Sequence, residues 1–169
     1  MRVSLNLIKK YIDLPSEITS KQIAYDLTLR TVEVEAVENT AEKYNNIVVG
    51  KILEVRKHPN ADLLRVCIVD IGEEEPVQIV CGGSNLYEGE YVVVSLPGAM
   101  VVWHGEGEPV EIKKTKMRGE SSYGMICGAE EVYLDSFFPP KTETEIVDLQ
   151  GIDCYPGQNI SELIGMDDT

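Results

Sequence analysis

The segment IKKTKMRG at residues 112–119 concentrates positive charge in a pattern that suits one kind of chemistry. In an extended strand alternate side chains share a face, so Lys114, Lys116 and Arg118 would line up on one side. Alternate residues lie about 7 Å apart, close to the spacing of phosphates along an extended nucleic-acid strand, so three cations can follow a phosphate backbone without distinguishing bases. A solvated edge strand whose lysines prevent aggregation explains the same pattern equally well.

Two turn-like segments add polar side chains. In HPNAD, residues 58–62, Pro59 fixes one dihedral angle and Asn60 suits local bonds to the backbone, so a turn alone accounts for the motif. In CGGSN, residues 81–85, two glycines permit close approach to the backbone, and Ser84 and Asn85 can donate or accept hydrogen bonds. A phosphate-binding nest fits this loop, but no Walker lysine follows, which argues against ATP binding there.

The other reactive side chains form no catalytic or metal-binding pattern. Neither His58 nor His104 stands at a recognisable spacing from a nucleophile and an orienting carboxylate, so we expect both in turns or on the surface. The cysteines are widely spaced, without a CxxC pair or a histidine at zinc-ligand spacing. Buried free thiols are therefore favoured over a metal site or a disulfide framework for Cys67, Cys81, Cys127 and Cys154.

The elements that must position these residues are mostly strands. From Ile47 onward the candidates are Ile47–Val55, Leu63–Ile71, Val77–Cys81, Tyr91–Leu96, Val110–Arg118, Gly124–Cys127 and Glu145–Leu149. Consecutive apolar residues, as in VVVSL, indicate burial on both faces or a closed barrel with covered ends. A five-stranded barrel of the OB type fits, and such barrels commonly bind single-stranded or looped nucleic acid. Ser121 and Ser122 can then bond phosphate, and Met125 can pack on a base or fill the end of the barrel.

Shorter elements flank the β-rich part. Ser4 is a candidate N-cap for a first helix, and Thr19 or Ser20 can cap a second. The alternating TVEVEAVEN predicts a strand at Thr31–Asn39. A small helix is expected at Ile160–Ile164. The predicted fold class is therefore mainly β with flanking helices (α+β).

Composition limits the functions that this chain can perform. A length of 169 residues, 43% of them hydrophobic, fits one or two compact units. The net charge of −14 opposes nucleic-acid binding by the chain as a whole, because neutralisation of phosphates supplies most of such affinity. The distribution of charge can override the total, since eight of fifteen basic residues fall in two short segments, at Lys51, Arg56, Lys57, Arg65, Lys113, Lys114, Lys116 and Arg118. No apolar run approaches the roughly 20 residues that cross a bilayer, and no leader is apparent, so we expect a cytoplasmic protein with no membrane partner.

Three consecutive segments, HPNADLLRVCIVD, QIVCGGSNLYEGEYVVVSLPGA and IKKTKMRGESSYGMICGAEE, resemble the tRNA-binding module at the carboxy end of human EMAP II and in several tRNA synthetases. The opening MRVSLNLIKKYIDLPSEITSKQIAYDLTLRTVEVEAVE and the closing ISELIGMDDT resemble the amino-terminal part of bacterial phenylalanyl-tRNA synthetase beta chains. The resemblance covers essentially the whole chain, with a departure around Phe137–Thr142.

This resemblance implies a five-stranded OB-fold barrel inserted in an incomplete small α/β domain. Residues 1–40 would be the first piece of the amino-terminal beta-chain domain, residues 41–153 the OB-fold tRNA-binding domain, and residues 154–169 the truncated start of the second piece. The chain would then be an excised fragment of a longer protein. The implied RNA-binding residues are Lys57, Asn60, Arg65, Ser84, Asn85, Lys114, Lys116, Arg118, Ser121, Ser122 and Met125.

The resemblance also implies a division of labour. The parent would be an ATP-dependent phenylalanine–tRNA ligase, an (αβ)2 heterotetramer that uses ATP and magnesium, with its catalytic site in the alpha chain. This fragment would contact tRNA without catalysis and without a cofactor of its own. Two alternatives stay open: an assembly module of the heterotetramer with little RNA affinity, and a free-standing tRNA-binding, chaperone-like dimer. The helical preface argues against the second, because such proteins usually begin near the first strand of the barrel.

Overall fold

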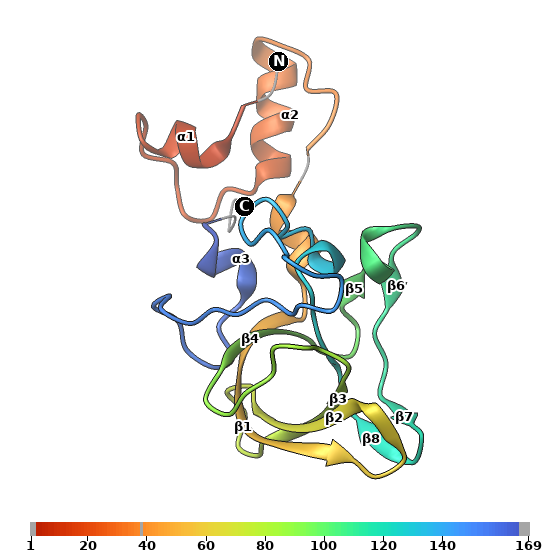
Figure 1. Cartoon of the computed structure of the whole chain (residues 1–169). Coiled ribbons are helices and arrows are strands. Elements are labelled where there is room, and N and C mark those ends of the chain that lie inside the picture. Colours follow the sequence, from red (N-terminus) through yellow and green to blue (C-terminus); the bar gives the residue numbers. More distant parts are fainter. Residues whose placement is uncertain (1–2, 38, 166–169) are drawn as a thin grey trace. The chain divides into compact units, whose positions relative to one another are not determined.

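The structure is a computed structural model, and it describes residues 3–37 and 39–165 (Figure 1). The chain divides into two compact units, one of Met1–Glu42 with Gly165–Thr169 and the other of Lys43–Ile164. We refer to them as the helical unit and the β unit.

The helical unit contains α1 (Leu5–Lys9) and α2 (Ser20–Arg30). Both predicted caps are confirmed: the Ser4 hydroxyl accepts a hydrogen bond from the Leu7 N–H at 3.3 Å, and the Thr19 hydroxyl accepts one from the Gln22 N–H at 3.2 Å. No residue of either helix is fully buried. These helices therefore contribute little apolar burial of their own.

The strand predicted at Thr31–Asn39 is wrong. Residues 31–37 and 39 form no strand, and Glu38 lies outside the described residues. Backbone donors of this segment bond back to α2 instead, from Val32 N–H to Leu27 O at 3.1 Å and from Val34 N–H to Thr28 Oγ1 at 3.0 Å. Alternating β-branched residues form a strand where a neighbouring strand completes the ladder, and the described part of this unit contains none.

The β unit is built on a five-stranded antiparallel sheet in the order β3-β2-β1-β4-β9. The strands are β1 (Ile47–His58), β2 (Ala61–Asp70), β3 (Val77–Cys81), β4 (Tyr91–Ser95) and β9 (Met125–Ile126). A register shift between Ile52 and Glu54 marks a bulge at which the long strand β1 can bend. The predicted fold class, mainly β with flanking helices and an OB-like sheet, is confirmed.

The sheet curls until its two edges meet, and its strands form a ring in Figure 1. Tyr123 N–H donates to Gln78 O at 2.8 Å, and Val80 N–H donates to Ser122 Oγ at 3.0 Å. Residues just before β9 therefore bond to β3 at the opposite edge. The interior is tightly packed, because a Cβ added at Gly50 would lie 2.6 Å from a methyl carbon of Val94.

Apolar side chains from all five strands fill the ring. The buried cluster comprises Ile52, Cys67, Val69, Ile71, Ile79, Cys81, Val92, Val94, Ile126 and Ile146. All four cysteines are free, as predicted, and three of them are buried. Burial raises the pKa of the Cys67 thiol to about 12 and that of the Cys81 thiol to about 11, which keeps both protonated and unreactive.

Smaller elements complete the β unit. β5 (Met100–Val101) pairs with β6 (Val110–Glu111), and β7 (Thr115–Met117) pairs with β8 (Glu120–Ser122). The 3-10 turns are η1 (Thr40–Tyr44), which begins in the helical unit, η2 (Trp103–Gly105) and η3 (Glu130–Val132). The predicted C-terminal helix is confirmed as α3 (Ile160–Leu163), with Asn159 as its N-cap.

The strand predicted at Glu145–Leu149 is wrong. The described chain forms no ladder there: an isolated bridge joins Val92 and Asp148, and single backbone bonds run from Val147 N–H to Cys127 O at 3.0 Å and from Leu149 N–H to Tyr91 O at 2.8 Å. β4 already pairs with β1 along its length and with β9 at Val94 and Ser95, so only its first residues can accept another neighbour. The apolar residues of this segment are buried by packing, without a ladder.

Candidate nucleic-acid interface

The basic segment forms a hairpin, and the prediction of one continuous strand over Val110–Arg118 is wrong. β6 ends at Glu111 and β7 begins at Thr115, because Ile112 is buried and exchanges backbone bonds with Gly98 and Ala99 at 2.8 Å each. β7 and β8 are then joined by the two residues Arg118 and Gly119, whose φ angles are 51° and 100°. Two positive φ angles are what a type I′ hairpin turn requires. Arg118 therefore lies in the turn and not on the strand.

This β7–β8 hairpin is fastened to the turn between β1 and β2. The buried His58 accepts a hydrogen bond at Nδ1 from Asn60 N–H at 3.0 Å, so its proton lies on Nε2, which donates to Met117 O at 2.9 Å. Asn60 Nδ2 donates to Arg118 O at 3.0 Å, and the Arg118 guanidinium reaches Asn60 O at 3.5 Å. We call these contacts the His58 clamp. They fix one hairpin turn against the other.

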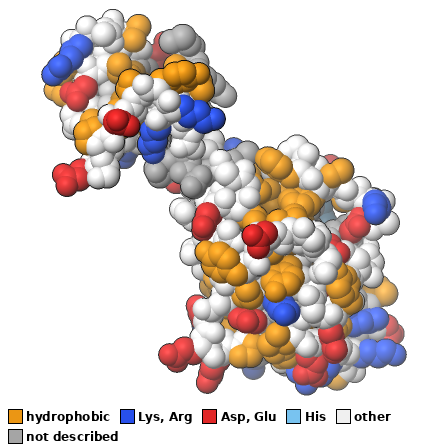
Figure 2. All heavy atoms as spheres, turned by 90° about the vertical axis from the view of Figure 1, so that its left-hand side faces the viewer, with side chains coloured by type: hydrophobic (Ala, Val, Ile, Leu, Met, Phe, Trp, Pro, Cys, Tyr) orange, Lys and Arg blue, Asp and Glu red, His pale blue; other side chains and the backbone are white. Residues whose placement is uncertain are grey.

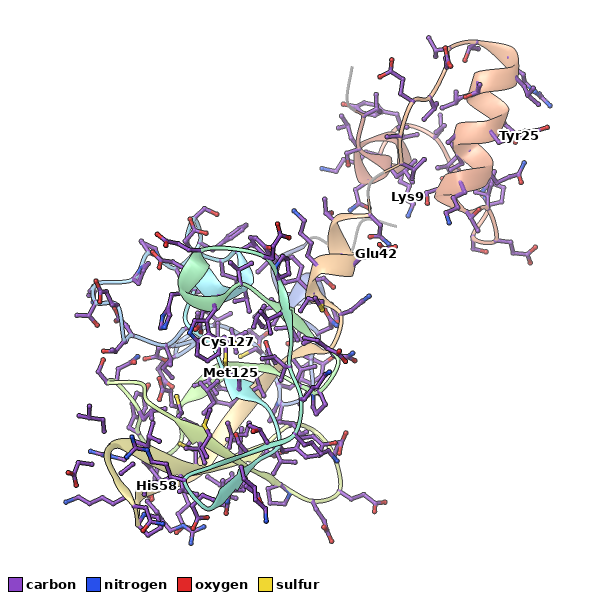
Figure 3. The ribbon with its side chains drawn as sticks, turned by 90° about the vertical axis from the view of Figure 1, so that its right-hand side faces the viewer. Lys9, Tyr25, Glu42, His58, Met125 and Cys127 are labelled. Atoms are coloured by element: carbon purple, nitrogen blue, oxygen red, sulfur yellow. The ribbon has the colours of Figure 1, made fainter. Side chains whose placement is uncertain are left out.

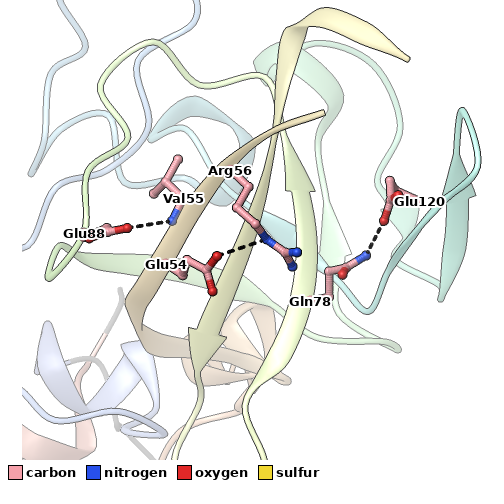
Figure 4. A network of polar contacts seen from close by, with 6 residues as sticks. All are labelled: Glu54, Val55, Arg56, Gln78, Glu88 and Glu120. Atoms are coloured by element: carbon pink, nitrogen blue, oxygen red, sulfur yellow. Dashed lines mark hydrogen bonds and ion pairs between the residues drawn. The ribbon is translucent and has the colours of Figure 1, made fainter. Parts of the chain in front are cut away.

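β8 is held from its other side by β3. Gln78 Nε2 donates to Glu120 Oε2 at 3.1 Å (Figure 4) and also to Ser121 O at 2.8 Å. The Ser122 hydroxyl, 2% exposed, accepts from Val80 N–H and donates to Gly124 O at 2.8 Å. The hairpin is thus anchored along both its turn and its second strand.

An open groove lies between this hairpin and β3. Its volume is about 550 Å³, and its lining residues are Pro76, Val77, Gln78, Lys114, Thr115, Lys116, Ser121, Ser122 and Tyr123. Lys114 Nζ lies 4.2 Å from the centroid of the Tyr123 ring. Within the described chain neither Lys114 nor Lys116 forms an ion pair, whereas Lys113 pairs with Glu111 at 3.5 Å. The main groove therefore carries two cations that no carboxylate neutralises by direct contact.

A second, smaller hollow of about 240 Å³ adjoins the same hairpin. Arg56, Lys57, Pro59, Val66 and Glu120 line it. Arg56 is held by Glu54 at 3.2 Å, as Figure 4 shows. Lys57 is exposed and stands opposite Arg65 in the β1–β2 register. Glu120 is half-buried between two basic regions and bonds to Gln78.

The structure brings several sequence-predicted site residues together. Those at the main groove are Lys114, Lys116, Ser121 and Ser122. Lys57 lines the second hollow, and Asn60 and Arg118 belong to the His58 clamp. The Ser122 hydroxyl bonds within the sheet closure and the Asn60 amide within the clamp, so both side chains have structural roles.

The other four predicted site residues lie outside both grooves. The amide of Asn85 bonds both backbone groups of Ile146, and Ser84 bonds Thr144 O, so these two residues hold the segment after residue 143. The Arg65 guanidinium donates to the carbonyls of Asp62 and Leu64. Met125 is half-buried in β9 beside Cys127, at some distance from His58 (Figure 3).

Three residues at this surface escaped the sequence analysis. Tyr123 and Gln78 line the main groove, and His58 organises the clamp. Tyr123 directly follows Ser121 and Ser122 in the motif SSYGM, so its position beside two predicted site residues could have identified it. The roles of Gln78 and His58 depend on partners 42 and 59 positions away, which no local pattern reveals.

Acidic and basic side chains are scattered over both units on the face that Figure 2 shows.

No group of three or more His, Cys, Asp or Glu side chains in the described residues is arranged to hold a metal ion. No described helix is long and apolar enough to cross a membrane.

Residues 47–150 match the family described as "Putative tRNA binding domain", and the chain belongs to this family. The match extends over the five-stranded sheet and both grooves. The predicted tRNA-binding module is thereby confirmed.

Among individual proteins, the chain is 38% identical over 168 residues to the phenylalanine–tRNA ligase beta subunit of Lactiplantibacillus plantarum, covering 99% of this chain and 20% of that protein. It is 43% identical over 141 residues to the same subunit of Halalkalibacterium halodurans, covering 83% of this chain and 17% of that protein. The chain therefore spans about a fifth of the length of these relatives. A MetRS-related protein from Pyrococcus horikoshii aligns in structure with a TM-score of 0.48 at 16% identity, over 74% of this chain and 98% of that one.

Proposed function

We propose that this chain binds tRNA through the main groove and the adjoining clamp, chiefly by contacts to phosphates. The observation that most directly supports this proposal is that Lys114 and Lys116 line a groove in a member of a tRNA-binding family. Neither ammonium group has a carboxylate partner among the described residues, so both can contact phosphates without first breaking an ion pair. Such contacts position an RNA backbone and distinguish little between tRNA sequences.

The relatives support a wider setting for this activity. By this proposal the chain acts within the beta subunit of a cytoplasmic, ATP-dependent phenylalanine–tRNA ligase that pairs with an alpha chain in an (αβ)2 heterotetramer. Its part is to hold tRNA while the aminoacylation chemistry, with ATP and magnesium, takes place elsewhere in the parent enzyme. The homology to beta subunits over 99% of the chain supports this assignment.

The net charge of −14 favours one competing function, an assembly module with little RNA affinity. A body of such charge repels RNA at long range, so only the local cations favour binding. The two functions differ in what they predict for the groove lysines, and a binding experiment separates them.

The test is fluorescence anisotropy of labelled phenylalanine tRNA and an unrelated tRNA, titrated with the chain over a series of salt concentrations. We expect similar affinities for both RNAs and a steep loss with salt. Changing Lys114→Gln and Lys116→Gln together removes two phosphate contacts, so the slope of log K against log salt should become shallower by roughly 1.5–2.

Lys113→Gln is the matched control, because Lys113 is adjacent in sequence but already paired with Glu111 and absent from the groove lining. Its salt slope should stay near that of the unaltered chain. An unchanged slope in the double variant would refute the phosphate contacts, and no binding even at low salt would refute the proposed function and favour the assembly module.

A further inference from the structure

The side chain of Tyr123 is presented to the main groove in a fixed position. Its ring packs against the buried apolar cluster, and its backbone N–H is bonded to Gln78 O at 2.8 Å. Lys114 Nζ lies 4.2 Å from the ring centroid, and both residues line the groove. Because the core covers one side of the ring, the groove side is the one that a ligand can reach.

We infer that this groove takes one unpaired nucleotide of the RNA, whose base stacks on Tyr123 after displacing the Lys114 ammonium. The released Lys114, together with Lys116, then contacts the neighbouring phosphates. This inference rests on the proposed function and specifies the class of RNA that the same site selects.

The magnitudes favour this exchange. A lysine over an aromatic ring at an exposed site changes an equilibrium constant by about two- to five-fold. A base stacked on an aromatic side chain changes it by about five- to 150-fold, and the displaced ammonium gains a phosphate partner. Lys114 therefore covers the ring in the free protein without blocking a base.

The dimensions and lining of the groove agree with a nucleotide. Its volume of about 550 Å³ falls within the range of small-ligand sites. Pro76 and Val77 add apolar surface beside the ring, and Thr115 and Ser121 supply hydroxyl groups. The Gln78 amide nitrogen is already bonded to Glu120 and Ser121, so this donor is not available to read a base. We therefore expect little preference among bases.

The need for an unpaired nucleotide follows from stacking. A base within a duplex has both faces covered by its neighbours, whereas a base in a loop or single strand can turn outward onto a protein ring. The groove thus favours loops and single-stranded ends over stems, while lysine contacts alone would favour neither.

The experiment titrates the chain with a labelled oligouridylate of about 12 nucleotides and with an RNA duplex of equal phosphate number. The oligouridylate should bind more tightly. Tyr123→Leu should weaken its binding about ten-fold without changing the salt slope, because stacking is lost and no phosphate contact is removed. Tyr123→Phe keeps the aromatic face and should bind like the unaltered chain.

A spectroscopic readout keeps the inference testable if the leucine variant folds poorly. Tyr123→Trp in a Trp103→Phe background places the single tryptophan at the groove, since Trp103 is the only tryptophan of the chain. Its fluorescence should be quenched by oligouridylate and should not be quenched by heparin, whose anionic groups can draw Lys114 away but which has no base to stack.

Quenching by both ligands, or by neither, would overturn the inference, as would unchanged binding in Tyr123→Leu. If Lys114→Gln with Lys116→Gln weakens tRNA binding while Tyr123→Leu does not, the proposed function stands and the stacking site is refuted. If the lysine variant also binds normally, the proposed function fails.

Discussion

Glu90 is a carboxylic acid placed where water cannot reach it. Its side chain is 0% exposed, Oε2 accepts a hydrogen bond from Tyr87 N–H at 3.1 Å, and Oε1 has no hydrogen-bond partner among the residues that the structure describes. Burial raises the pKa of Glu90 from 4.5 to about 7, with a smaller contribution from the nearby charge of Asp148. The acid is therefore largely protonated in the folded chain at slightly acidic pH.

This raised pKa predicts that the chain loses stability as the pH rises. The folded state binds the Glu90 proton more tightly than the unfolded state does. The stabilisation from this proton is therefore complete below pH 4.5 and is lost as the pH rises through about 7. The total change from this one group is at most ~3 kcal/mol. In Glu90→Gln the free energy of unfolding should vary less with pH between these two values, as measured by urea unfolding at several pH values.

Glu88→Gln provides the matched control for Glu90→Gln. Glu88 is a neighbouring acid that is exposed and accepts a hydrogen bond from Val55 N–H at 3.4 Å, so its replacement removes a carboxyl group without removing a buried one. Its stability should follow the pH profile of the unaltered chain. A profile for Glu90→Gln that parallels the unaltered chain would show that Glu90 is ionised without penalty in the folded state.

At the scale of elements, the β7–β8 hairpin has an unusual turn composition. Arg118 adopts a φ of 51°, a conformation that costs most residues roughly 1–2 kcal/mol and that asparagine tolerates. Arg118→Asn should therefore raise the free energy of unfolding by about 1 kcal/mol, less any loss of the 3.5 Å contact to Asn60 O. Thermal unfolding followed by the fluorescence of Trp103 measures this change.

Gly119 gives the opposite test within the same turn. It has a φ of 100°, and an added Cβ would meet nothing closer than Asn60 Nδ2 at 3.6 Å, so only backbone strain opposes a side chain there. Gly119→Ala should lower stability by about 1 kcal/mol. If the free energy of unfolding changed equally in Arg118→Asn and Gly119→Ala, backbone strain in the turn would not determine the stability of the hairpin.

The same hairpin shows what local sequence patterns reveal about elements. VVVSL and its neighbours predicted the strands of the sheet correctly because each has a partner strand that buries its apolar residues. TVEVEAVEN has the same local character, but its described residues pair with no strand, and their backbone bonds to α2 instead. IKKTKMRG also resembles a strand, and only Gly119 signals the turn, because arginine at positive φ is not typical.

The candidate site was predictable to a similar extent. Charge and spacing located Lys114 and Lys116, and both line the groove, although only Lys116 lies in β7. The roles of His58 and Gln78 arise where distant hairpins meet, and Asn85 was assigned to RNA although its amide holds Ile146. A polar residue in a turn can bind RNA or bond to the protein's own backbone, and tertiary contacts decide which of the two it does.

At the scale of the molecule, opposite electrostatic effects act over different ranges. The net charge of −14 repels RNA over the Debye length, which is about 8 Å at physiological salt and about 30 Å at 0.01 M. Contacts between the groove lysines and phosphates act at direct range. Very low salt therefore strengthens the contacts and also extends the repulsion, so the salt slope of the groove is best measured between about 0.05 and 0.2 M.

The two units differ in how much apolar surface they bury, and this predicts a difference in local stability. No residue of α1 or α2 is buried, Tyr11 and Leu29 are 81% and 65% exposed, and short helices without packing are marginal in water. In the β unit, β1 is bonded on both sides and contributes Ile47, Val49 and Ile52 to the interior. Amide hydrogen exchange followed by mass spectrometry should therefore show α2 exchanging at the earliest times, β3 at the sheet edge later, and β1 last. Protection of α2 equal to that of β1 would mean that burial within each unit does not set its stability, and that something outside the described contacts holds the helices.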